Sequence, residues 1–328
     1  MPLAITSVLA MLTLAAGPNS EAMIAPETAA VMSWPRRPIS IRADITNQHG
    51  IFVQAKINGS RPLWFLVDSA AGYPWILDSQ RASELRLALG GKGAGWGTGE
   101  DPVDLAFASG ASVSVGGCEL NHQTLAATSL QELQRYAGRQ LDGILGYELF
   151  NHYVVEIEYA SGTINLYDPV GYQYSGPGKS IPVALENNHF LAKTRIILWG
   201  ESVEGRFLVD TGAGEIAAAL TRPFVDSNKL LMVMRGRIPS RLHAGLGGLT
   251  RSLTGRAQSV QIGPVLLRDV LVDLSRDATG LLASSRFDGV IGGELLRRFK
   301  VIFDQSHQRI ILEPNPHLPA SFEVPVGG

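Results

Sequence analysis

Hydrophobic and polar residues alternate over short stretches through much of the chain. Ile51–Ile57 alternates in this way, and Asn58-Gly59 then marks a tight hairpin turn before the apolar run Leu63–Val67. Phe190–Leu198 and Val203–Val209 repeat the arrangement on either side of a polar turn. Alternation with a period of two is typical of strands that bury one face. The pattern therefore predicts a protein built mainly from β-strands.

Helical patterns are few and short. Ser79–Leu89 and Thr221–Leu231 each follow one of the hairpins, and each opens with a Ser or Thr that could cap a helix. Two further hairpins are expected, over Tyr153–Tyr159 with Thr163–Tyr167 and over Phe299–Asp304 with Arg309–Glu313. The same order of elements is thus predicted in both halves of the chain.

A short acidic motif occurs twice. Phe65–Gly72 reads Phe-Leu-Val-Asp-Ser-Ala-Ala-Gly, and Phe207–Gly214 reads Phe-Leu-Val-Asp-Thr-Gly-Ala-Gly. Each copy is followed by Asp-Gly, two aliphatic residues and Gly, at Asp142–Gly146 and at Asp288–Gly292. A single repeat of about 140 residues predicts two similar lobes and not a solenoid. We interpret it as an internal duplication.

The repeat predicts where the lobes begin and end. We expect an N-terminal lobe over residues 38–170 and a C-terminal lobe over residues 181–316. Residues 171–180 between them include several Gly and Pro residues, which is typical of a linker.

Residues 1–22 are predicted to be a signal peptide. Their apolar run is too short to cross a bilayer comfortably, and small residues that could flank a cleavage point follow it. The usual positive charge at the start is missing, so a disordered N-terminus is the alternative. No later segment is apolar enough for a membrane span. We expect a periplasmic or secreted protein.

Composition excludes several classes of function. The chain has 328 residues, 45% of them hydrophobic and 18% charged, with a net charge of −2. Without a basic excess to neutralise phosphates, a nucleic-acid partner is not expected. Cys118 is the only cysteine and lies in an apolar stretch, which indicates a buried thiol, and an exported chain without disulfides suggests a bacterial envelope. The seven histidines show no ligand spacing, so we expect neither a metal site nor a cofactor.

The repeated motif carries the candidate chemistry. Asp68 and Asp210 each end an apolar strand on a turn of small residues, once per half of the chain. This placement suggests that the two carboxylates meet face to face. Two close carboxylates cannot both ionise cheaply, so they share one proton and can activate water. A glycosidase would also use paired carboxylates, but the sequence shows no aromatic-rich platform for a sugar.

The loop pattern resembles that of the retropepsin/pepsin class of aspartic peptidases. Both halves match, from about residue 40 to residue 315, so the chain is similar to a fused two-lobe version. The resemblance implies an all-β, bilobal pepsin/retropepsin-like acid protease fold, with two related β-barrel-like lobes and short helices. It implies hydrolysis of peptide bonds in extended peptide or protein substrates without a cofactor. Because one chain supplies both lobes, we expect a monomer.

The resemblance also implies residue roles. Asp68 and Asp210 would be catalytic, and Ser69 and Thr211 would brace their loops across the lobe interface. The remaining loop residues are Ala70, Ala71, Gly212 and Ala213. Two glycine-rich segments would form flaps over the substrate, with Gly95, Trp96, Gly97, Gly247 and Gly248 as the candidate contacts.

The sequence departs from the family pattern at one loop position. Ala70 stands where glycine is expected, and its methyl could crowd the site. The alternative function is therefore a weak or inactive peptidase-like protein that binds extended peptides. Ala71 and Ala213 stand where Ser or Thr could donate to a carboxylate. Without that hydroxyl the pKa values of the pair should be higher, which predicts an optimum in weak acid to near-neutral solution.

Overall fold

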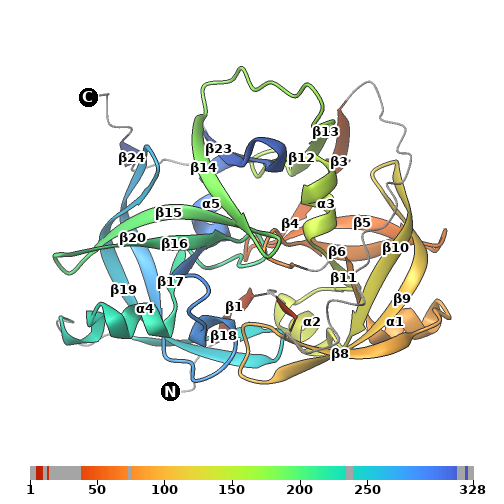
Figure 1. The fold of residues 1–328 in the computed structure, drawn as a ribbon, viewed down its shortest axis with the longest axis horizontal. Coiled ribbons are helices and arrows are strands. Elements are labelled where there is room, and N and C mark those ends of the chain that lie inside the picture. The colour runs from red at the N-terminus through yellow and green to blue at the C-terminus, as the bar shows by residue number, and fades with distance from the viewer. Residues whose placement is uncertain are drawn as a thin grey trace.

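The computed structural model describes residues 5–9, 13–14, 38–72, 75–233, 239–315 and 322–323. Most of the predicted signal peptide, residues 1–22, lies outside the described residues, although two short strands within it are placed. Strands dominate the structure, and two sheets account for them (Figure 1). The prediction of an all-β protein with short helices is confirmed.

The first sheet has nine strands. They are β2 (Thr13–Leu14), β4 (Asp44–Ile45), β5 (Ile51–Ile57), β6 (Leu63–Val67), β7 (Trp75–Asp78), β8 (Gly90–Trp96), β9 (Pro102–Val115), β10 (Cys118–Thr128) and β11 (Gly143–Leu145). Their order is β2-β8-β9-β10-β7-β11-β6-β5-β4, and β9 also pairs with β5. The added pairing folds the sheet back on itself and encloses a core.

The second sheet has fifteen strands. They are β1 (Ile5–Leu9), β3 (Ile39–Arg42), β12 (Val154–Glu158), β13 (Thr163–Tyr167), β14 (Lys179–Glu186), β15 (His189–Leu198), β16 (Glu201–Val209), β17 (Ala218–Leu220), β18 (Ser240–Gly245), β19 (Gly248–Ile262), β20 (Val265–Ser275), β21 (Gly289–Ile291), β22 (Phe299–Asp304), β23 (Arg309–Pro314) and β24 (Phe322–Glu323). Their order is β1-β18-β19-β20-β17-β21-β16-β15-β14-β23-β22-β12-β13-β3, with β24 beside β20 and a further pairing of β19 with β15.

The two halves of the chain share a strand order. The run β10-β7-β11-β6-β5 in the first sheet matches β20-β17-β21-β16-β15 in the second. In both, the strand that precedes the acidic loop runs parallel to a three-residue strand: β6 to β11, and β16 to β21. The match supports the predicted duplication, which stays a prediction, as do the lobe boundaries.

A bridge of six strands joins the halves, in the order β14-β23-β22-β12-β13-β3. Its central pair is β12 of the first half with β22 of the second, antiparallel. The core beside this bridge is shared as well. Phe150, Phe190 and Phe303 are fully buried and meet edge to face, with ring centroids 5.0 to 6.1 Å apart. The halves therefore share one hydrophobic core and are not merely tethered.

The helices are short. They are α1 (Ser79–Glu84), α2 (Gln131–Ala137), α3 (Tyr147–His152), α4 (Arg222–Ser227) and α5 (Gly293–Leu296), with 3₁₀ turns η2 (Leu230–Met232), η3 (Leu281–Ala283) and η4 (Gln305–His307). The predicted helix Ser79–Leu89 is too long, since α1 ends before Arg86, which adopts a positive φ of 54°. Asp78, and not Ser79, caps this helix, because its carboxylate accepts from the N–H groups of Gln80 and Arg81.

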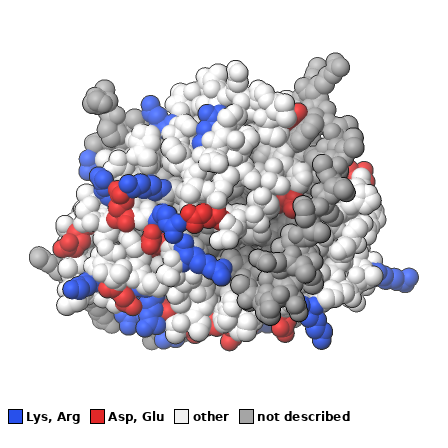
Figure 2. Space-filling view, in the orientation of Figure 1, with Lys and Arg blue, Asp and Glu red and all other residues white. Residues whose placement is uncertain are grey.

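Among the described residues, no helix is long and apolar enough to cross a membrane. On the face drawn in Figure 2, blue and red side chains are intermixed over the lobe on the left. This mixture agrees with the nearly balanced charge of the sequence.

Candidate active site

Each acidic loop begins where a buried strand ends. Asp68 follows β6 and Asp210 follows β16, and both aspartates are fully buried. The N–H of Asp68 donates to the carbonyl of Leu145 at 2.9 Å, and the N–H of Asp210 donates to the carbonyl of Ile291, also at 2.9 Å. The parallel strands β11 and β21 therefore hold the two aspartates in the same way.

The Asp-Gly pairs that precede these parallel strands have a structural role. The carboxylate of Asp142 accepts the N–H of Trp64 at 2.8 Å, and that of Asp288 accepts the N–H of Arg206 at 2.8 Å. A Cβ on Gly143 would lie 2.2 Å from the ring of Phe65, so that position has no room for a side chain. Both acids act as anchors for the strand that leads to the acidic loop.

The two loops are tied to each other by reciprocal hydrogen bonds. The N–H of Ser69 donates to Oγ1 of Thr211 at 3.0 Å, and the N–H of Thr211 donates to Oγ of Ser69 at 3.1 Å. The two hydroxyls donate in turn to the carbonyls of Val209 and Val67. The structure thus brings together residues of the two halves that the sequence separates widely.

The carboxylates lie against each other's loops. Oδ1 of Asp68 accepts from the N–H of Ala70 at 2.8 Å, and Oδ1 of Asp210 accepts from Gly212 at 2.7 Å and Ala213 at 3.1 Å. A Cβ on Gly212 would lie 2.5 Å from the Cγ and Oδ2 of Asp68. Oδ2 of each aspartate is buried and has no hydrogen-bond partner among the described residues. These two oxygens are the atoms left free for a proton or for water.

Burial dominates the electrostatics of the pair. The pKa of Asp68 is raised well above its usual value, first by burial and then by the negative charge of Asp210. Burial also raises the pKa of Asp210 to about 6, although the N–H groups of Gly212 and Ala213 oppose the shift. Because a second charge is costly here, the pair keeps one proton over a range of pH that reaches toward neutrality.

Ala70 fits its position without excess space. It is fully buried and packs in a cluster that includes Leu191 and Leu208 of the second half. Its carbonyl contacts Nε2 of His189 at 3.0 Å. Because a carbonyl oxygen only accepts, Nε2 of His189 donates to it, and burial lowers the pKa of the ring. Sequence reasoning missed His189, because it stands isolated in the chain and carries no motif.

The glycine-rich segments form two hairpins whose turns meet. β8 and β9 form one hairpin and β18 and β19 the other. The N–H of Gly99 donates to the carbonyl of Leu246 at 2.9 Å, and the N–H of Asp101 donates to that of Gly247 at 2.8 Å. Of the predicted flap residues, Gly95 and Trp96 end β8, Gly97 follows it, and Gly247 and Gly248 lie at the turn into β19.

An extended stretch of the chain's own N-terminus lies along both hairpins. β1 runs parallel to β18, with Leu9 opposite Gly245. β2 runs antiparallel to β8, with Thr13 opposite Trp96 and Leu14 opposite Gly95. Figure 1 shows β1 near the centre of the molecule, close to the β18 label. Both hairpins therefore have edges that can take an added strand.

Other candidate chemistry is sparse in the described part of the chain. No cluster of three or more His, Cys, Asp or Glu side chains there could hold a metal ion. Cys118 is buried, and burial raises the pKa of its thiol, which does not favour a nucleophile.

Comparison with known proteins finds one family match, within the first half of the chain. Residues 53–149 match the family model described as aspartyl protease. The match includes Asp68, and it ends before Asp210. No curated protein matches the chain. The matched segment, the all-β fold and the paired acidic loops agree with the resemblance to aspartic peptidases, and the match supports an aspartic peptidase family.

Proposed function

We propose that this protein is an aspartic endopeptidase in which Asp68 and Asp210 together activate water. The observation that carries the proposal is the arrangement of the two carboxylates. Both are buried, each has one oxygen anchored by backbone N–H groups, and each has one oxygen without a partner among the described residues. A water bound between the two free oxygens would be held by one ionised and one protonated acid.

The chemistry follows from the shared proton. The ionised carboxylate takes a proton from water as the oxygen of that water attacks the peptide carbonyl carbon. The protonated carboxylate donates to the carbonyl oxygen, which forms a neutral tetrahedral intermediate. When the C–N bond breaks, the acid that received the proton from water returns it to the leaving nitrogen, and the other carboxylate takes a proton from a hydroxyl of the intermediate, which restores the starting pair. The pair acts as a unit, so neither role belongs to one residue alone.

The two hairpins support an extended peptide as the substrate. The backbone of β1 and β2 already pairs with β18 and β8, which is the mode in which an added strand binds a sheet edge. A substrate held in the same way would gain main-chain hydrogen bonds with little dependence on its sequence. Gly95, Trp96, Gly97, Gly247 and Gly248 would then cover it.

The remaining features of the proposal rest on the sequence. One chain supplies both acidic loops, so the site needs no second copy and the enzyme would act as a monomer. Residues 1–22 would direct it to the periplasm or the medium. Peptides and proteins are the substrates, and no cofactor takes part.

A peptide-binding protein without catalysis is the second candidate, and Ala70 is the observation that favours it. We would incubate the purified protein with peptides and denatured proteins from pH 3 to pH 8 and identify the cuts by mass spectrometry. Cuts that are absent in Asp68→Asn, absent in Asp210→Asn and blocked by a statine-type inhibitor are expected. If the folded protein makes no cuts at any pH, even as Ala70→Gly, the peptidase proposal is wrong. Cuts made only by Ala70→Gly would mean that Ala70 has disabled the site.

A further inference from the structure

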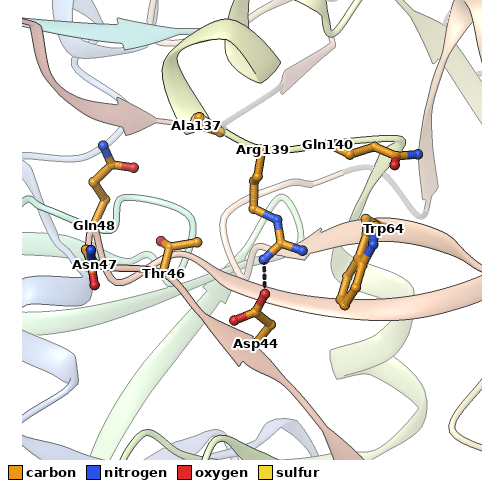
Figure 3. Close-up of a pocket in the computed structure, with 9 residues that line it drawn as sticks. Asp44, Thr46, Asn47, Gln48, Trp64, Ala137, Arg139 and Gln140 are labelled. Carbon is orange, nitrogen blue, oxygen red and sulfur yellow. Dashed lines mark hydrogen bonds and ion pairs between the residues drawn. The ribbon is translucent and has the colours of Figure 1, made fainter.

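A polar cavity of about 490 Å³ lies in the first half of the chain (Figure 3). It is formed by the loop that follows β4, by β6 and by the segment that follows α2. The residues that matter to its chemistry are Asp44, Asn47, Gln48, Trp64, Arg139 and Gln140. The cavity is therefore rich in hydrogen-bonding groups and has an aromatic wall.

A narrow hollow connects this cavity to the acidic loops. The two share Thr46, Gln48 and Ala137 in their walls, and the hollow continues to Leu66 and Gly212. Gly212 is the residue that lies directly against the carboxylate of Asp68. A peptide bound at the aspartates would therefore lie next to the hollow that leads to the polar cavity.

The path of β1 brings an extended chain close to one wall of the cavity. β1, which pairs with β18, also contacts α2. The C-terminal end of α2, at Ala137 and Gly138, forms part of the cavity wall. A peptide that takes the path of β1 would therefore run along the rim of the cavity, with alternate side chains pointing to one face.

Arg139 is held in the cavity in a fixed orientation. Its guanidinium carbon lies 4.1 Å from the ring centroid of Phe52 and 4.4 Å from that of Trp64. Nη1 donates to the exposed carboxylate of Asp44 at 2.5 Å. Nε is buried and has no hydrogen-bond partner among the described residues. Because a guanidinium has five N–H groups, this pairing leaves donors for a ligand.

We propose that this cavity binds a carboxylate or carboxamide side chain of the peptide substrate, with Arg139 as the specificity-determining residue. The proposal deepens the proposed function and rests on it. A planar guanidinium held over two rings presents its remaining N–H groups, which fit an oxygen of a carboxylate or of an amide. Asn47 and Gln48 can complete the shell, and a cationic Lys or Arg side chain would meet Arg139 with like charge.

Binding of scanned peptides tests this specificity. We would use the Asp210→Asn chain, which should not cut, and extended peptides of Ala and Leu with a single Glu, Gln or Lys moved through each position. At one position, the peptides with Glu or Gln should bind at least about tenfold tighter than the peptide with Lys. This difference is expected for one charge-assisted hydrogen bond. Fluorescence anisotropy gives the affinities.

Four further substitutions test the role of Arg139. Arg139→Met should abolish the preference at that position and leave the other positions unchanged. Arg135→Met is the matched control, because it removes an exposed arginine of α2 outside the cavity. Asp44→Asn removes the carboxylate that already pairs with Arg139, so the affinity for the Glu peptide should rise relative to that for the Gln peptide. If Arg139→Met fails to fold, Arg139→Lys is the second variant, because it keeps the positive charge but loses the planar set of guanidinium N–H groups. The peptide with Gln should then lose more affinity than the peptide with Glu.

The possible outcomes separate the subsite from the peptidase function. A Glu preference that persists in Arg139→Met, or the absence of any preferred position, overturns the subsite even if the wild-type chain cuts peptides. An Arg139-dependent preference in a wild-type chain that never cuts supports the subsite and overturns the peptidase proposal. If no peptide binds at all, both proposals are overturned.

Discussion

Ser69 and Thr211 each bind the backbone N–H of the other, at 3.1 and 3.0 Å, through their side-chain hydroxyls. Each hydroxyl then donates to a carbonyl of the opposite half, at Val209 or Val67. All of these groups are buried. The relative position of Asp68 and Asp210 therefore depends on four hydrogen bonds that no water can replace without opening the interface.

Replacing Thr211 by Val should destabilise the protein. The methyl groups fill the same space, but the N–H of Ser69 and the carbonyl of Val67 lose their buried partner. We expect a loss of about 2–4 kcal/mol in the free energy of unfolding, because each buried unsatisfied group costs about 1–3 kcal/mol. Urea unfolding measures it, and Thr211→Ser is the control that keeps the hydroxyl. Equal stability of the Val and Ser variants would contradict this account.

The pH dependence of cleavage should be bell-shaped with its maximum in weak acid to near-neutral solution. At low pH both aspartates are protonated and no base is available, and at high pH both are ionised and no acid is available. Because burial raises the pKa of Asp210 to about 6 and that of Asp68 well above its usual value, the rising limb should lie near pH 6. Measurement of kcat/KM from pH 2 to pH 9 checks this. A profile that stays flat below pH 3 would count against it.

Asp210→Asn should stabilise the folded protein at neutral pH. Burial raises the pKa of Asp210 from its ordinary value of 3.8 to about 6 in the folded protein, so folding favours the protonated form. This contribution is fully present below pH 3.8 and is lost as the pH rises through about 6. Asn cannot ionise, so the variant should be more stable than wild type by about 2–3 kcal/mol at pH 7 and similar at pH 3. Stability curves that run parallel over this range would refute the prediction.

Contact between the two hairpin turns should matter for catalysis. A Cβ on Gly99 would lie 2.1 Å from the backbone of Gly247, so Gly99→Ala must separate the turns. We expect kcat/KM to fall roughly tenfold to a hundredfold, because the substrate would be held less closely. Gly90→Ala is the matched control, since a Cβ there meets nothing within 4 Å. If both variants retain wild-type kcat/KM, the contact has no role in the reaction.

Local patterns predicted much of this architecture. The alternation over Ile51–Ile57 and the turn at Asn58-Gly59 are properties of neighbouring residues, and β5 has these bounds in the structure. The two acidic motifs likewise predicted where each loop would follow its strand. The ends of helices were harder to predict, because the end of α1 depends on the contacts that place Arg86 in a left-handed conformation.

Patterns along the chain are sufficient for the all-β class and for the two loops that carry Asp68 and Asp210, because each of these depends on residues that are close in sequence. The bonds between Ser69 and Thr211, the contact of His189 with Ala70 and the position of Arg139 over two rings come from the fold. These contacts join segments far apart in the chain. Their geometry follows from how the two halves pack, which no local pattern of hydrophobic and polar residues specifies.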